Sequence, residues 1–393
     1  MKALRKYIDK IKSNFQEGGR FHAFRSVFDG VETFLFVPDE TSKSGTHIHD
    51  SIDSKRIMSI VVIALVPAVL FGMFNVGYQH FLHTTGNVGN FWEMFMYGFL
   101  AVLPKIIVSY AVGLGIEFVV AQWKKEEIQE GFLVSGMIIP LIVPVNCPLW
   151  ILAVATAFSV IFAKEVFGGT GMNLFNVALI TRAFLFFAYP TKMSGDTVWV
   201  SGESILGLGS TVDGLTSATA LGVTSTALEP TGYPAFSWDM VTGLIPGSIG
   251  ETSVIAILLG AALLLVTGIA SWKIMFSVFA GGAFMAFLFN AIGPDTAMAH
   301  MPWYEHLVLG GFCFGAVFMA TDPVTAARTE KGKYVYGLLI GMMAIIIRVL
   351  NPGYPEGMML AILLMNIFAP LIDYGVVQSN ISRREKRILK SNN

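Results

Sequence analysis

The sequence predicts an all-α polytopic membrane protein with about ten transmembrane helices. Of its 393 residues, 54% are hydrophobic and only 13% are charged, about half the charged share of an ordinary soluble protein. Apolar runs of about 20 residues, the length that crosses a bilayer as a helix, recur along the chain. Lys and Arg gather in alternate connecting segments, as they do in loops that face the cytoplasm. These three observations together exclude a soluble globular fold.

Ten apolar runs are candidate spans, and several of them contain proline or paired glycine. Pro67, Pro104, Pro140, Pro144 and Gly310–Gly311 fall inside runs. Interrupted helices are tolerated where neighbours satisfy the freed backbone or where the gap lines a cavity. We place the spans at residues 57–78, 95–121, 131–146, 148–163, 174–189, 252–271, 274–293, 305–320, 334–350 and 357–376.

The distribution of basic residues predicts the orientation of these spans. With a cytoplasmic N-terminus, the inner segments hold 22 of the 26 Lys and Arg, and the outer segments hold only Lys192. Both termini are then cytoplasmic, and the long segment 190–251 lies outside. We therefore divide the chain into a cytoplasmic N-terminal segment (1–55), a first five-helix unit (56–189), the outer segment (190–251), a second five-helix unit (252–376) and a basic cytoplasmic tail (377–393).

Five spans on each side of the outer segment predict an inverted repeat. An odd number of spans per half turns the second half over. Phe71–Gly77 reads FGMFNVG and Phe287–Gly293 reads FLFNAIG, and each half has an interruption, GGTGMN at 168–173 and TDPVTA at 321–326. Inverted repeats with broken helices are typical of a solute path or cofactor site near the midplane. The alternative is that the small residues serve only helix packing.

Composition and motif searches exclude several other functions. The formal net charge of −1 gives nucleic-acid binding no electrostatic basis. Cys147 and Cys313 are too few for an iron–sulfur cluster or a Cys-rich zinc site, and we expect buried thiols. His47 and His49 fit no standard metal spacing, so no metal site is predicted. No nucleotide-binding fingerprint is present.

The outer segment contains the most specific motif. Residues 213–219 read DGLTSAT, which resembles the flavin-attachment signal of the sodium-pumping NADH:quinone oxidoreductases and the related Rnf complexes. The resemblance implies that Thr219 carries FMN through a phosphodiester bond, within a motif formed by Asp213, Gly214, Thr216, Ser217 and Ala218. Ser217 stands where the family usually has glycine.

The resemblance extends over nearly the whole chain. It is closest to the B subunit of the sodium pump, a translocase, because the D subunit that is its Rnf counterpart typically lacks so long an N-terminal segment. It implies a urea-transporter-like fold, a bacterial inner-membrane location, contact with membrane lipid, and assembly with the A, C, D, E and F subunits of the complex. NADH would be oxidised on another of these subunits. The stretches that carry the resemblance are 44–58, 163–176, 181–190 and 366–377.

The resemblance also implies a non-covalent riboflavin and a quinone site. Electrons would pass from FMN on the C subunit to FMN here, then to riboflavin and quinone. Asn173 and Asn176 match the family's riboflavin region, and their carboxamides suit the polar edge of a flavin ring. The alternative is that they cap a helix N-terminus. Gly113 and Leu114 match a stretch linked to the quinone site, although close glycines also permit tight helix packing.

Three charged residues within predicted spans are further candidates. Arg182 lies deep in an apolar run, where a charge is costly, so it either acts on a nearby cofactor or pairs with an acid such as Glu117. Glu117 and Asp373 lie near the inner ends of their spans. Their oxygens suit sodium, although acids at span ends are often merely solvated.

Two function classes remain open from the sequence. One is the flavin-bearing subunit of a redox-driven sodium pump, with an Rnf-type subunit as its variant. The other is a channel or transporter for a small solute, which the ten-span repeat fits equally well. Such a channel would have no need of an attachment motif at Thr219, and it would function without partner subunits.

Overall fold

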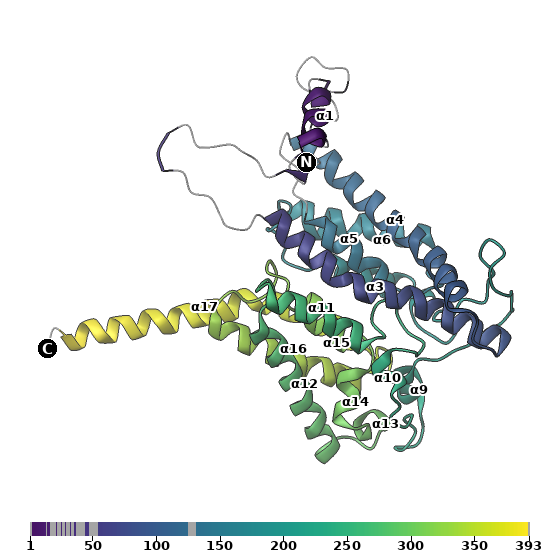
Figure 1. Cartoon of the computed structure of the whole chain (residues 1–393). Coiled ribbons are helices and arrows are strands. Elements are labelled where there is room, and N and C mark those ends of the chain that lie inside the picture. The colour runs from purple at the N-terminus through teal and green to yellow at the C-terminus, as the bar shows by residue number, and fades with distance from the viewer. Residues whose placement is uncertain are drawn as a thin grey trace.

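The computed structural model describes residues 2–12, 14–15, 21, 25, 28, 32, 35–36, 44–46, 54–124 and 131–391. Within these residues the chain is helical apart from loops and one isolated β-bridge, Ile205 to Leu208. Six of these helices are long and apolar enough to cross a membrane, and three apolar helices are shorter. The prediction of a polytopic helical membrane protein is therefore confirmed. Figure 1 shows α3–α6 gathered on one side of the molecule and α11–α17 on the other.

The first two long helices cross at paired glycines. α3 (Ser54–Thr85) and α4 (Phe91–Lys124) are almost wholly apolar, and each contains one proline. A Cβ on Gly77 of α3 would lie 1.8 Å from the carbonyl oxygen of Met94, and a Cβ on Gly98 of α4 would lie 1.6 Å from that of Met73. The two backbones can approach this closely only because neither residue has a side chain.

The rest of the first half consists of shorter pieces. α5 (Phe132–Leu141) ends at Leu141, with Ile142 as its cap, so the span predicted over 131–146 is too long. α6 (Leu149–Ser159) continues as a π-helical turn, η2 (Val160–Lys164), and a 3₁₀ turn, η3 (Glu165–Phe167). Gly168, Gly169 and Gly171 have positive φ, which ends the helix where GGTGMN predicts an interruption. α7 (Val177–Ala188) then follows.

The outer segment has little regular structure. It contains α8 (Pro190–Met193), α9 (Ala220–Thr226) and α10 (Asp239–Thr242), joined by loops. Its last residues reach back to the first half, since a Cβ on Gly72 of α3 would lie 2.1 Å from the carbonyl oxygen of Ile249. The outer segment is therefore packed onto the helices and does not form a separate layer.

The second half repeats the use of glycine at a helix crossing. α11 (Val254–Val266) packs on α3, α12 (Trp272–Ile292) on α16 (Glu330–Leu350), and α16 on α17 (Met358–Ser391). A Cβ on Gly281 of α12 would lie 2.2 Å from the carbonyl oxygen of Leu338, and a Cβ on Gly341 of α16 would lie 2.1 Å from that of Val278.

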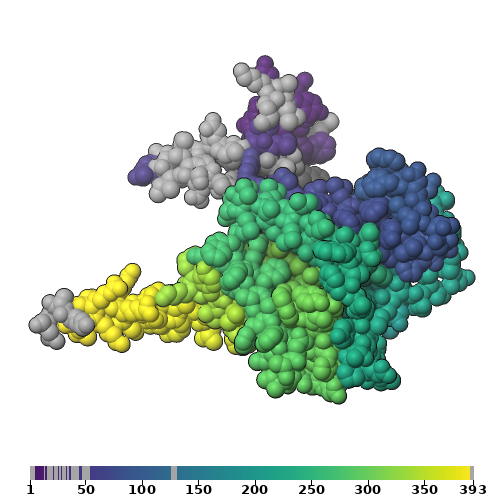
Figure 2. Space-filling model, turned by 60° about the horizontal axis from the view of Figure 1, so that its bottom comes forward, coloured from purple at the N-terminus to yellow at the C-terminus, as the bar shows by residue number. Residues whose placement is uncertain are grey.

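One predicted span in the second half is interrupted, and the last helix is longer than its predicted span. The span predicted over 305–320 is broken at residues 309–311, between α14 (Trp303–Val308) and α15 (Phe312–Phe314), and η4 (Gly315–Met319) follows as a π-helical turn. α13 (Ala297–His300) precedes them. The tail predicted to begin at residue 377 is a continuation of α17, which leaves the body of the molecule at the yellow end of Figure 2.

Candidate functional site

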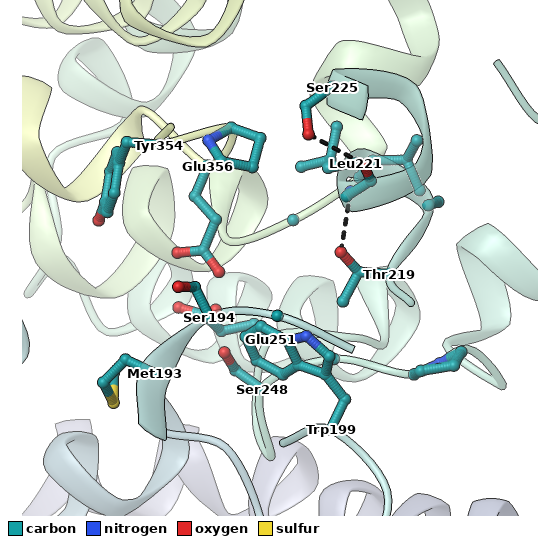
Figure 3. Close-up of a pocket in the computed structure, with 18 of the residues that line it drawn as sticks. Met193, Ser194, Trp199, Thr219, Leu221, Ser225, Ser248, Glu251, Tyr354 and Glu356 are labelled. Carbon is teal, nitrogen blue, oxygen red and sulfur yellow. Dashed lines mark hydrogen bonds between the residues drawn. The ribbon is translucent and has the colours of Figure 1, made fainter. Parts of the chain in front are cut away.

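A cavity of about 250 Å³ lies where the two halves meet the outer segment. We name it the outer cavity because residues 190–251 form much of its wall. Figure 3 shows Trp199, Ser248 and Glu251 on one side, Tyr354 and Glu356 on another, and Thr219 at the end near α9. The cavity thus brings together residues from α7, the outer segment, the break at 309–311 and the turn before α17.

Arg182 of α7 links two separate parts of this wall, Glu251 and Glu356, to the end of α5. Its Nη1 donates to both carboxylate oxygens of Glu251, at 3.1 and 3.2 Å, and to the carbonyl oxygen of Ile142, at 2.5 Å. Its Nη2 contacts the carboxylate of Glu356. The side chain is only 3% exposed, so an unpaired charge here would be costly. Arg182 therefore does pair with acids, as one of the two predictions had it, but these acids are Glu251 and Glu356 and not Glu117.

Backbone carbonyl groups at the ends of broken helices also contact the buried arginines. Ile142, which accepts from Arg182, is the C-terminal cap of α5. Arg348 of α16 donates to the carbonyl oxygens of His306 (2.6 Å) and Leu309 (3.3 Å) at the end of α14. Carbonyls at helix C-termini carry partial negative charge and favour cations. Two arginines are thus held by interrupted helices beside the outer cavity.

Thr219 is the N-cap of α9 and lines the outer cavity. Its Oγ1 accepts from the backbone N–H of Gly222 at 3.0 Å. An oxygen in an ester linkage can still accept this hydrogen bond, so the cap and a covalent modification are compatible. Of the other motif residues, Asp213, Gly214 and Thr216 are exposed, whereas Ser217 and Ala218 are half-buried.

A second pocket, of about 80 Å³, lies at the opposite ends of the helices, beside Lys164 and the interruptions at 168–173 and 321–326. We name it the inner pocket. Asn173 and Asn176 both line it, as does Asp322. The two interrupted segments predicted from the sequence therefore meet in space at one pocket.

The two asparagines of the inner pocket also have structural roles. Asn176 caps α7: its Oδ1 accepts from the N–H groups of Ala178 (3.0 Å) and Leu179 (3.4 Å). Its Nδ2 donates to Asp322 at 3.2 Å, which leaves one amide hydrogen for a ligand. Asn173 donates to the carbonyl oxygen of Phe175 at 3.0 Å. The capping prediction is confirmed for Asn176, and a ligand role stays a prediction.

The two sodium candidates are both hydrogen-bonded within the protein. Glu117 is buried and pairs with Lys164 through one oxygen, while its Oε2 has no hydrogen-bond partner among the residues that the structure describes. Asp373 accepts from the backbone N–H groups of Arg328 (2.7 Å) and Thr329 (2.9 Å) and from the Thr329 hydroxyl (2.5 Å). Asp373 thereby holds the start of α16, and its role in ion transport stays a prediction.

Gly113 serves helix packing. A Cβ at Gly113 would lie 2.0 Å from the ring of Phe132, so α4 and α5 touch there. Leu114 is partly buried against the core. Neither residue lines the outer cavity or the inner pocket. The packing alternative is therefore confirmed for Gly113, and a place in a quinone site stays a prediction for both residues.

Three acids of these sites were not singled out from the sequence. Glu251, Glu356 and Asp322 lie in loops and at span ends, where acids are common, so position alone gave no signal. The signal that could have identified Glu251 and Glu356 is that a buried Arg182 needs acidic partners. His47 and His49 lie outside the described residues, and within the described ranges no group of three or more His, Cys, Asp or Glu could hold a metal. Cys147 and Cys313 are buried free thiols, as predicted.

The fold and its two sites define a multi-pass helical membrane protein with a cavity and a smaller pocket where broken helices meet. A sequence model described as "NQR2, RnfD, RnfE family" matches residues 41–382. The B subunit of the Na(+)-translocating NADH-quinone reductase from Chromohalobacter salexigens is 45% identical over 98% of this chain and 96% of its own length. The B subunits of the same reductase from Azotobacter vinelandii (45%) and Pseudoalteromonas atlantica (44%) align over 98% of this chain and 99% of their own. The chain belongs to this family, on the branch formed by the B subunits of the Na(+)-translocating NADH-quinone reductases.

Proposed function

We propose that the chain is the flavin-bearing membrane subunit of a sodium-translocating NADH:quinone reductase. It would take electrons from a flavin on the C subunit, pass them to quinone, and couple this flow to sodium export. One observation carries the proposal: the hydroxyl of Thr219, in a flavin-attachment motif, lines a cavity of about 250 Å³ beside a buried arginine. Family membership at 45% identity over nearly the whole chain supports it.

The outer cavity suits an FMN attached to Thr219. Its volume is close to the lower end of the range for small-molecule pockets. Trp199, Phe186 and Tyr354 supply aromatic surface for a flavin ring, and Ser248 Oγ is buried without a hydrogen-bond partner. Arg182 adds a fixed positive charge at the wall. Bound FMN would supply one- and two-electron redox chemistry, and these residues would hold it out of water.

We propose that riboflavin binds non-covalently at the inner pocket. Its carboxamides, the Asp322 carboxylate and Thr170 give it the polar lining that the edge of a flavin ring requires. Its 80 Å³ is well below the usual volume of a ligand pocket, so the segments at 168–173 and 321–326 must move apart when a ring enters. Asn173 and the free amide hydrogen of Asn176 are the contacts we assign.

We place the quinone and sodium sites at the same end of the helices as the inner pocket. A quinone ring could approach Gly113 and Leu114 only if Phe132 moved. For sodium, the unpartnered Oε2 of Glu117 is the best-placed free oxygen of the two candidates, because the carboxylate of Asp373 is engaged at the start of α16. We propose Glu117 as the entry ligand and Asp373 as a neighbour of the path.

We propose that the helices form a ten-span inverted repeat of the urea-transporter type, with both termini on the cytoplasmic side. Two parallels between the halves support this. The first helices of the halves, α3 and α11, pack on each other, and so do the last, α7 and α17. In each half the fourth helix is followed by a loop that lines one of the two sites. Residues 168–176 follow α6 and its π-helical and 3₁₀ turns and line the inner pocket, and residues 351–357 follow α16 and line the outer cavity.

In-gel flavin fluorescence of the denatured chain tests the proposal. The complex is expressed with its flavin transferase, and the parent is compared with Thr219→Val. Thr211→Val, an exposed hydroxyl of the same segment, is the matched control. We expect fluorescence in the parent and in Thr211→Val and none in Thr219→Val, with the adduct found by peptide mass analysis on residues 211–222. A dark parent would remove the redox function and leave the solute channel, which solute flux through the isolated chain in liposomes would then test.

A further inference from the structure

His80 is buried at the end of α3 that faces the outer segment, and its ring has one defined protonation state. The side chain is 0% exposed and stacks on Tyr97 of α4 with ring centroids 4.0 Å apart. Nε2 lies 3.2 Å from the backbone N–H of Ser210, which can only donate, so Nε2 accepts. Nδ1 lies 2.7 Å from the carbonyl oxygen of Ser201, so Nδ1 carries the proton. The ring is therefore neutral in this contact.

The loop that meets His80 is shaped around the ring. A Cβ on Gly209 would lie 2.2 Å from Nε2, and Gly209 has a φ of +78°, so both space and backbone require glycine there. The preceding turn is closed by hydrogen bonds in both directions between Ile205 and Leu208, at 3.0 and 2.9 Å. Residues 201–210 thus form a rigid loop whose two ends are both bonded to one imidazole.

This loop carries the attachment segment, residues 211–219. The N–H of Val212 donates to the carbonyl oxygen of Gly202 at 2.8 Å, next to the residue held by Nδ1. The N–H of Ser217 donates to the carbonyl oxygen of Asp196 at 2.6 Å. Asn146 holds the preceding loop residues independently, through the carbonyl oxygens of Thr197 (2.8 Å) and Val200 (3.0 Å). His80 and Asn146 thus both hold the loop that leads into the segment, and of these two only His80 can titrate.

We propose that His80 is a positioning residue for the attachment segment and that protonation of its ring releases this segment. An imidazolium carries N–H on both nitrogens, so Nε2–H would face the N–H of Ser210 and that contact would be lost. The ionisable groups around the ring are Tyr97, whose hydroxyl donates to the carbonyl oxygen of Glu203 at 2.5 Å, the exposed Glu203 carboxylate, and His83 one turn along α3. None of them is hydrogen-bonded to the ring to stabilise its cation. The loop is thus held at neutral pH and freed in acid.

The role of Thr219 in flavin attachment belongs to the proposed function. The test therefore measures how accessible the segment is by thiol labelling, and it does not use flavin as the signal. Leu215→Cys, at a half-buried position of the segment, is introduced into the assembled complex. Its maleimide labelling rate is divided by that of the fully exposed Leu228→Cys, which removes the pH dependence of the thiol itself. The native Cys147 and Cys313 are buried and give a low background. Between about pH 8 and about pH 5 we expect the ratio to rise about tenfold, the effect of losing one buried hydrogen bond.

Three variants separate His80 from its neighbours. His80→Ala should label fast at every pH, and His80→Gln, which keeps a donor and an acceptor, should label slowly and without pH dependence. Asn146→Ala should label faster than the parent yet keep the rise in acid, and His83→Gln should keep it too, although His83 Nε2 lies 3.4 Å from Ser217 Oγ. A rise that persists in His80→Gln, a rise abolished by His83→Gln, or no rise in the parent would each overturn the proposal. Flavin attachment at Thr219 is scored separately by gel fluorescence.

Discussion

At the outer cavity the carboxylates are held by an arginine, whereas at the inner pocket the Asp322 carboxylate is held by neutral donors. The buried ion pair at the wall of the inner pocket, Lys164 with Glu117, does not include Asp322. At the outer cavity, Arg182 meets Glu251 and Glu356 and two arginines sit on carbonyls at the ends of broken helices. At the inner pocket, Asp322 accepts from Asn176 (3.2 Å), Thr325 (3.1 Å) and the N–H of Val324 (3.1 Å), and no ion pair to it is found in the described part of the chain.

This difference bears on how the two regions can change. A paired network is costly to break because each partner left behind becomes an unpaired buried charge. Neutral hydrogen bonds are weaker singly and can be exchanged for those of a ligand. The outer cavity is thus the rigid region, suited to a permanently attached group, and the inner pocket is the region where segments can separate. The predictions below test this contrast.

Removal of the central cation should have the largest effect. Arg182→Met leaves the buried Glu251 and the half-buried Glu356 without their partner and should lower the free energy of unfolding by about 3–5 kcal/mol. Thermal unfolding in detergent measures it. The matched control is Lys273→Met, whose pair with Glu330 is at the surface and should cost no more than about 1 kcal/mol. Equal losses for the two variants would contradict a rigid outer network.

Filling the space at Gly113 should have the next largest effect. Gly113→Ala places a methyl group against the Phe132 ring and should cost about 1–3 kcal/mol of unfolding free energy by overpacking. At Gly115 the same methyl group would meet nothing within 4 Å, so Gly115→Ala should be neutral or slightly stabilising. Urea denaturation of the two variants side by side gives the comparison. A neutral Gly113→Ala would mean that room for a ring already exists beside α4.

Asn176→Ala should weaken the inner pocket in two ways at once. It removes the cap of α7, worth about 1 kcal/mol, and one hydrogen bond to Asp322, worth about 1 kcal/mol more. Ser253→Ala, which removes only the cap of α11, should lose about half as much unfolding free energy. If the two variants unfold alike, the bond from Asn176 to Asp322 contributes nothing to stability.

The smallest expected effect is local and concerns the cap of α9. Thr219→Ala should loosen α9 by about 1 kcal/mol, whereas Thr219→Ser keeps the accepting oxygen and should leave it unchanged. Hydrogen exchange of residues 220–226 measures this without relying on global unfolding. Equal exchange in Thr219→Ala and in the parent would show that the cap does not order the helix beside the outer cavity.

Much of the architecture was predictable because apolar run length and glycine placement act locally. Each of the six long helices overlaps a predicted span, and both interruptions occur where GGTGMN and TDPVTA stand. The errors are the spans placed at 131–146 and 305–320. There hydropathy continues across a break in the helix, and composition does not reveal the break. The inner pocket was foreseen through Asn173 and Asn176, but not through Asp322.

The sequence by itself determined that the chain crosses a membrane, where its helices run, that the segment ending at Thr219 resembles a flavin-attachment motif, and that Arg182 needs partners, because hydropathy, residue type and motif spacing are local properties. Only the tertiary structure decided who those partners are. Arg182 meets residues 40, 69 and 174 positions away, and Thr219 lines their cavity because α9 is folded against the break at 309–311. Contacts at such separations depend on how the broken helices end and pack, and no local pattern encodes that.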